Sequence, residues 1–156
     1  MKKISGKRSK TDADFEELAR LEFQGSLYFS KTGPVLPGRL IEATITNGAK
    51  KTRDGKIAKS AMFVEDNPVL DYKGPKTREG LWADENYRLV VPVVISRARV
   101  MRTRPIFNEW KVEVEVNYDD TQANESQVFK WLEAAGTQEG LGDWRPRYGR
   151  FEVERV

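Results

Sequence analysis

The residues best suited to chemistry in this sequence are arginines and lysines, and most of the 27 gather in four segments. These residues are Lys2, Lys3, Lys7, Arg8 and Lys10; Lys50, Lys51, Arg53, Lys56 and Lys59; Arg97, Arg99, Arg102 and Arg104; and Arg145, Arg147 and Arg150. An arginine guanidinium binds phosphate with two parallel hydrogen bonds, and clustered positive charge attracts a polyanion. The segments therefore predict contact with nucleic acid or another anionic partner, although a solvated charged face would show the same pattern.

Two of these segments have a spacing or composition that strengthens the prediction. Residues two apart on a strand share a face, so Arg97 with Arg99, and Arg102 with Arg104, are expected to form a row that faces water or phosphate. Residues 144–150 alternate aromatic and basic side chains. In that segment Trp144 and Tyr148 could stack on bases while the arginines bind phosphate. The alternative is that both aromatic rings close the edge of a core and the nearby glycines only form a turn.

The sequence contains no histidine and no cysteine, which excludes most enzyme chemistry. Without them there is no imidazole base, no thiolate nucleophile and hardly any basis for a zinc site. Carboxylate pairs occur at 65–66, 84–85 and 119–120, but none has the spacing of a known metal site. Solvated loops explain these pairs better than a metal-dependent nuclease does. We therefore predict a protein that is not an enzyme and uses no cofactor.

The length of 156 residues and the net charge of +3 describe one domain of modest size. Its 24 acidic residues concentrate away from the basic segments, so the small net charge conceals strong local separation. No apolar run is long enough to span a membrane, and no apolar segment follows the basic start as it would in a secretory signal. A soluble intracellular protein without membrane contact is expected.

The first half of the chain is predicted to be mainly helical. Residues 1–11 are expected to form a flexible basic arm, and residues 12–156 a single domain. Thr11 is suited to cap a helix over 12–23, and apolar spacing predicts a second helix over 38–50. A basic loop over 50–56 then leads into an irregular insertion over 57–86. That insertion is expected to contain short strands at 61–64 and 69–72 and one helical turn at 79–83.

The second half is predicted to contain most of the sheet. Residues 89–95 are apolar on both faces and predict a buried strand, in which Pro92 leaves one side unpaired or bulged. Strict alternation over 110–118 predicts a strand with one buried face. Asn124 caps a helix that ends at Gly136, a glycine loop spans 140–143, and 151–156 alternates as a final strand. This order predicts an α+β fold, a ferredoxin/RRM-like split βαβ sandwich with an irregular insertion.

Two segments resemble the RAMP superfamily, the RNA-binding proteins of CRISPR complexes. LPGRLIEA at 36–43 resembles the start of the first helix in that superfamily, and GLGDWRPRYGRF at 140–151 is similar to its glycine-rich loop, which contacts the RNA backbone. GLWADEN at 80–86, VMRTRPIF at 100–107 and GDWRP at 142–146 resemble proteins encoded by tailed phages and prophages. A RAMP domain opens with a strand before its first helix. Here either Met1 is an internal start, or residues 27–29 fill that place, or another chain supplies the strand.

The resemblance implies a phage-encoded nucleic-acid-binding protein in the cytoplasm of a bacterial host, with RNA or single-stranded DNA as its partner. The arginine row and the 140–150 loop would form its binding groove, and copies could oligomerise along the bound strand. A second hypothesis is an inhibitor of a host defence system, similar to an anti-CRISPR protein. Such an inhibitor would bind a defence ribonucleoprotein by mimicking or displacing a RAMP backbone subunit.

Overall fold

The computed structural model describes residue 4 and residues 6–156, and the chain forms two compact units. Unit 1 contains the residues up to Val35 together with Val69–Val112, and unit 2 contains Leu36–Pro68 and Glu113–Val156. Each unit has its own core of buried apolar residues. The sequence predicts a single domain from residue 12 onward, whereas the structure has two compact units.

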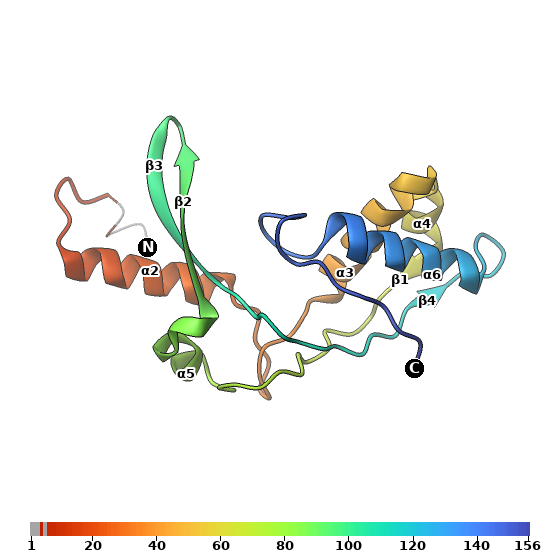
Figure 1. Ribbon diagram of the computed structural model, residues 1–156, viewed down its shortest axis with the longest axis horizontal. Helices are drawn as coiled ribbons and strands as arrows, with labels where there is room; N and C mark the ends of the chain where they lie inside the picture. The colour runs from red at the N-terminus through yellow and green to blue at the C-terminus, as the bar shows by residue number, and fades with distance from the viewer. Residues whose placement is uncertain (1–3, 5) are drawn as a thin grey trace. The chain divides into compact units, whose positions relative to one another are not determined.

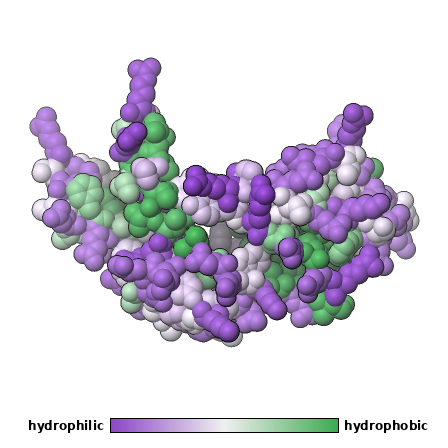
Figure 2. All heavy atoms as spheres, viewed as in Figure 1, coloured by the Kyte–Doolittle hydropathy of each residue, from purple (hydrophilic) through white to green (hydrophobic). Residues whose placement is uncertain are grey.

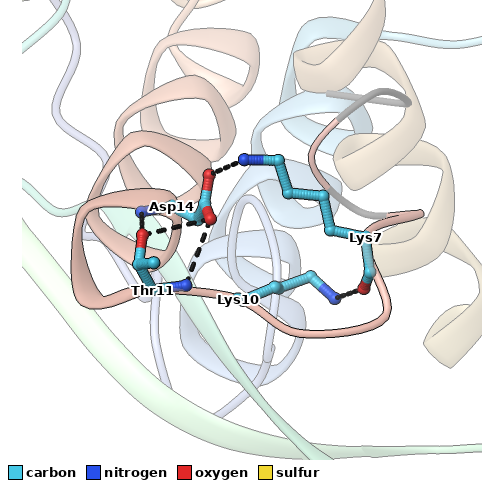
Figure 3. Close-up of polar contacts among 4 residues, drawn as sticks. All are labelled: Lys7, Lys10, Thr11 and Asp14. Atoms are coloured by element: carbon cyan, nitrogen blue, oxygen red, sulfur yellow. Dashed lines mark hydrogen bonds and ion pairs between the residues drawn. The ribbon is translucent and has the colours of Figure 1, made fainter.

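Helix α2 of unit 1 spans Asp12–Ser26 and begins as predicted at Thr11. The Thr11 hydroxyl accepts a hydrogen bond from the Asp14 amide, and the Asp14 carboxylate accepts one from the Thr11 amide (Figure 3). Lys7 forms a 2.6 Å ion pair with Asp14, and Lys10 donates to the Lys7 carbonyl over 3.1 Å. Lys7 thus ties the predicted flexible arm of residues 1–11 to α2, while Lys2 and Lys3 lie outside the described residues.

The rest of unit 1 is built around one β-hairpin (Figure 1). Helix α5 (Arg78–Ala83) and the short 3-10 helix η2 (Glu85–Tyr87) precede strands β2 (Arg88–Ile95) and β3 (Ala98–Pro105). Ser96 and Arg97 join the strands with φ of 47° and 69°, the left-handed conformation of a two-residue hairpin turn. The core of this unit contains Phe23, Leu27, Leu70, Tyr72 and Leu81.

Unit 2 consists of three α-helices, a 3-10 helix, a π-helical turn and a short pair of strands. In chain order these are α3 (Gly38–Ala49), the 3-10 helix η1 (Lys50–Thr52), α4 (Gly55–Ala61), β1 (Met62–Phe63), β4 (Asn117–Tyr118), α6 (Glu125–Ala134) and the π-helical turn η3 (Ala135–Glu139). Asn124 caps α6 as predicted, since its side chain accepts from the Gln127 amide. Ile45 and Trp131, both fully buried, belong to the core that joins α3 to α6.

The helices are the part of the fold that the sequence predicts well. Helices α2, α3, α5 and α6 lie where they are expected, within a few residues. Residues 50–56, predicted as a loop, are instead largely helical. The break between η1 and α4 is short and contains Arg53 in a left-handed conformation (φ 67°). The predicted irregular insertion 57–86 contains most of α4 together with β1, α5 and η2, and it is divided between the two units.

The predicted strands are less accurate. The strand over 110–118 is wrong for most of its length, since only Asn117–Tyr118 belongs to a strand and Lys111 forms a single bridge to Asp71. The alternation nevertheless reflects burial: Trp110 and Val112 pack on the core of unit 1, and Val114 and Val116 on that of unit 2. The final strand at 151–156 is also wrong, because an alternating segment without a neighbouring strand forms no ladder.

Strand β2 matches the predicted segment 89–95 but is not buried. Val90 and Val94 are exposed, so the face of β2 that carries them is uncovered, and among the described residues β2 has one neighbouring strand, β3. This topology confirms that the side of the strand where Pro92 lacks an N–H is unpaired.

The structure confirms an α+β protein at the coarse level. The described residues form two antiparallel sheets of two strands each, β1 with β4 and β2 with β3, and the ferredoxin-like arrangement is not confirmed. Among the residues described, no helix is both long and apolar enough to cross a membrane.

Candidate functional site

The strongest candidate site is an open groove of about 870 Å³ in unit 2, between the exposed face of α3 and helix α4. Five basic side chains line it, Arg39, Lys50, Arg53, Lys56 and Lys59, with Glu42 as the acidic residue of the lining. All five basic residues are exposed. We call this site the basic groove.

Helical spacing places the α3 residues of the groove on one side. Arg39, Glu42, Thr46 and Lys50 recur every three or four residues, while Ile41, Ile45 and Gly48 point to the buried core on the other side. The side of the helix opposite its apolar face therefore carries exposed Arg39 near its start and leads to exposed Lys50 just after its end. The spacing of Arg39 from Lys50 is the signal that could have identified Arg39, which was not among the predicted binding residues.

The turn before α4 is fixed by Asp54. Its Oδ2 accepts hydrogen bonds from the Trp131 indole Nε1 at 3.0 Å and from the Thr52 hydroxyl at 2.8 Å. These hydrogen bonds, that from Trp131 first, hold the pKa of Asp54 below its ordinary value. A Cβ on Gly55 would approach the Lys50 side chain to 2.5 Å, so glycine lets that chain lie against the start of α4. The turn thereby positions Lys56 and Lys59 across from α3.

The charges of the groove favour an anion. Its one carboxylate is engaged, because Glu42 Oε1 accepts the Val64 amide at 2.8 Å. Lys50 donates to the neutral Asn47 amide oxygen at 2.8 Å and so keeps its full charge. Several cations around one open groove are suited to a ligand with more than one phosphate. Over the described part of the chain, no three His, Cys, Asp or Glu side chains gather in a way that could hold a metal ion.

The structure brings together only some of the predicted residues of this segment. Lys50, Arg53 and Lys56 line the groove as one set. Lys51 does not line it and forms a 2.8 Å ion pair with Glu139.

The predicted loop over 144–150 keeps its two aromatic rings together and its arginines exposed. The rings of Trp144 and Tyr148 are half-buried against each other, with centroids 6.3 Å apart, whereas Arg145, Arg147 and Arg150 are exposed. The loop is closed by a 2.8 Å hydrogen bond from the Leu141 amide to the Gly149 carbonyl. A Cβ on Gly149 (φ 76°) would overlap that backbone, so glycine is required there. This loop belongs to unit 2, as the groove does.

The predicted arginine row has a different environment. Arg102 and Arg104 share a face of β3 as expected, but both interact with the buried carboxylate of Glu22 on α2. Arg102 donates to Oε1 of Glu22, Arg104 lies 3.9 Å from Oε2, and the Thr103 amide donates to Oε2 over 3.3 Å. Glu22 is only 8% exposed. These two arginines therefore stabilise the contact between α2 and β3.

Arg97 and Arg99 do not form the predicted same-face pair. Arg97 lies in the hairpin turn and not in a strand, because the two-residue turn needs left-handed backbone there. Arg99 pairs with Val94 on the face opposite to that of Arg102 and Arg104. The row belongs to unit 1 and the loop to unit 2.

Comparison with known proteins gives no match: no family model, curated protein or solved structure is significantly similar to this chain.

Proposed function

We propose that this chain binds nucleic acid, with the basic groove of unit 2 contacting the phosphate backbone. The observation that carries this proposal is the set of five exposed cations from α3, α4 and the turn between them, around a groove whose one carboxylate is already hydrogen-bonded. A polyanion that binds such a set releases condensed counterions, which makes binding favourable and strongly dependent on salt. The proposed activity is binding without catalysis.

The loop that carries Trp144 and Tyr148 favours a single-stranded partner, RNA or single-stranded DNA. Unstacked bases can lie on an aromatic ring, whereas the bases of a duplex are already stacked on one another. The three exposed arginines of the same loop are suited to adjacent phosphates. Both segments that resemble RAMP proteins, 36–43 and 140–151, belong to unit 2, and Arg39 of the first lines the groove. These placements support a RAMP-like origin, which remains part of the proposal.

The test is a titration of fluorescein-labelled oligonucleotides, single-stranded RNA, single-stranded DNA and duplex DNA, followed by anisotropy at several salt concentrations. The groove variant combines Arg39→Gln, Lys50→Gln and Lys56→Gln. Its matched control removes three exposed lysines of unit 1 with Lys31→Gln, Lys73→Gln and Lys111→Gln. We expect the groove variant to lose about tenfold or more in affinity and to show a shallower slope of log K against log salt, by about 0.7 for each lost phosphate contact on a single strand.

The control variant should bind like the wild type because its groove is intact, although it carries the same net charge as the groove variant. Equal loss in both variants would mean that net charge, and not the groove, attracts the ligand. If no oligonucleotide binds at low salt, the proposal is wrong. Stable co-purification with a defence ribonucleoprotein, without affinity for free nucleic acid, would support the inhibitor hypothesis instead.

A further inference from the structure

The β2–β3 hairpin of unit 1 exposes an apolar face. Val90 (53% exposed), Val94 (70%) and Met101 (57%) lie on the same side of the two strands, since Met101 pairs with Pro92 and β2 side chains two apart share a face. Figure 2 shows apolar side chains gathered over this hairpin. Contiguous exposed apolar surface of this kind is typical of an interaction site. We call these residues, with Arg99, the hairpin face.

The open edge of β2 is a poorer place for a partner than this face. The Thr103 amide donates to Glu22, so it points away from β2, and the pair of Val90 and Thr103 directs its main-chain groups outward. Pairs of this kind alternate along the ladder, so the pair of Pro92 and Met101, two positions further on, also directs its main-chain groups outward. Pro92 thus lacks its N–H on the outer edge of β2, which discourages the addition of another strand.

The charged side chains of the hairpin itself are all positive. Residues 88–108 contain five arginines and no carboxylate. Arg88 pairs with Glu85, and Arg102 and Arg104 interact with Glu22. Arg97 and Arg99 are exposed, and neither forms an ion pair with any residue that the structure describes. A partner for this face should therefore present an apolar side chain beside acidic ones.

The first half of α2 presents that combination. Phe15 is 58% exposed, and Asp12 lies three residues before it on the same side of the helix; Glu16 neighbours Asp12 one turn further along and flanks Phe15. Within the described residues neither carboxylate has an ion-pair partner. Further along the same helix, Glu22 already complements the arginines on the other side of the hairpin. We call Asp12, Phe15 and Glu16 the α2 patch.

We propose that the hairpin face of one copy binds the α2 patch of a second copy. Phe15 then packs on Val94 and Met101, and Glu16 or Asp12 pairs with Arg99. The two surfaces differ, so the contact is heterologous: a growing assembly has a free hairpin face at one end and a free α2 patch at the other. Direct face-to-face packing of two hairpins is disfavoured, because it would bring the Arg99 side chains of both copies together without an acid.

The test uses the full chain without nucleic acid, in sedimentation velocity and light scattering. Val94→Glu blocks the hairpin face and Phe15→Glu blocks the α2 patch, and both positions are exposed, so the fold should be retained; circular dichroism checks this. We expect the wild type to associate with increasing concentration and each variant alone to remain monomeric. Mixed in equal amounts, the two variants should form a 1:1 dimer, since each still carries the surface that the other needs. Val69→Glu, at another exposed apolar position of unit 1, is the control and should associate like the wild type.

Several outcomes would overturn the inference. A wild type that stays monomeric up to about 1 mM would exclude an interface of useful strength. Association that persists in Phe15→Glu but not in Val94→Glu would mean that the hairpin binds something other than the α2 patch. A mixture that yields no dimer would exclude the heterologous contact. As a second measurement, Arg99→Glu should weaken association at least severalfold, and Glu16→Arg in the same chain should restore it.

Discussion

The indole Nε1 of Trp131 donates a hydrogen bond to Oδ2 of Asp54 over 3.0 Å, and this contact joins the buried side of α6 to the turn that begins α4. Trp131 is fully buried, whereas α4 carries two of the basic residues of the groove. The groove is therefore held in shape by a core residue that does not line it. This relationship makes the stability of unit 2 and the proposed binding dependent on each other.

Trp131→Phe should test this dependence. The variant keeps an aromatic ring in the core but removes the indole donor and some volume. Unit 2 should lose about 1–3 kcal/mol in free energy of unfolding, because the Asp54 carboxylate loses a hydrogen bond and a small cavity forms. Urea denaturation followed by circular dichroism measures the loss, and oligonucleotide affinity should fall with it. Trp144→Phe, at a half-exposed loop position, should leave the urea midpoint nearly unchanged; equal effects of both variants would contradict the argument.

Asp54 should also give unit 2 a dependence on pH. Its pKa in the folded protein is lowered, chiefly by the hydrogen bond from Trp131, so the folded state favours the charged carboxylate. The resulting stabilisation is complete above the ordinary aspartate pKa of about 3.9 and is lost as the pH falls through the lower folded value. Urea midpoints measured between about pH 6 and pH 2 should therefore fall less steeply in Asp54→Asn than in the wild type. Asp66→Asn removes an exposed carboxylate of the same unit and should follow the wild-type curve.

The sequence predicts this fold best where the signal is local. Thr11 and Asn124 cap their helices because their side chains accept hydrogen bonds from backbone amides only three residues further on, and the apolar spacing of α3 and α6 is complete within each helix. Strands depend on partners far along the chain, which the sequence does not reveal. The alternation over 110–118 thus predicts burial correctly and pairing wrongly.

The candidate site shows the same division. Lys50, Arg53 and Lys56 are close in sequence and were predicted as a cluster, whereas Arg39 joins them only through the helical turns between. The interaction of Arg102 with Glu22 spans 80 residues, so nothing near Arg102 could indicate that it is already paired. A sequence read one segment at a time does not distinguish an exposed arginine from one that is partly buried and paired.

Glu22 should contribute more to stability than to binding. Its carboxylate accepts from Arg102 and from the Thr103 amide, and Arg104 lies nearby. Glu22→Gln leaves positive charge partly buried without compensation, so unit 1 should lose about 3 kcal/mol, the lower end of the range for a broken buried ion pair. Arg102→Gln should also destabilise, and the double variant should lose less than the sum of both. A double-mutant cycle from urea denaturation measures this coupling. If Arg102→Gln reduces nucleic-acid affinity at unchanged stability, the arginine acts in binding after all.

Gly48 should tolerate no larger residue, because α3 and α6 approach each other at this point. A Cβ at Gly48 would lie 2.5 Å from the Trp131 carbonyl oxygen and 2.6 Å from the Ala135 amide nitrogen, both backbone atoms of a packed helix. Gly48→Ala gains about 1 kcal/mol of helix propensity, but overpacking typically costs about 1–3 kcal/mol, and contacts this short put it at the upper end. We therefore expect a net loss of about 1–2 kcal/mol in urea denaturation.

Gly25→Ala is the matched control: it lies in α2 with no atom within 4 Å of the added Cβ, so it should stabilise by about 0.5–1 kcal/mol. Opposite signs for the same substitution would establish the close helix contact, whereas stabilisation by both would show that α3 and α6 do not meet at Gly48.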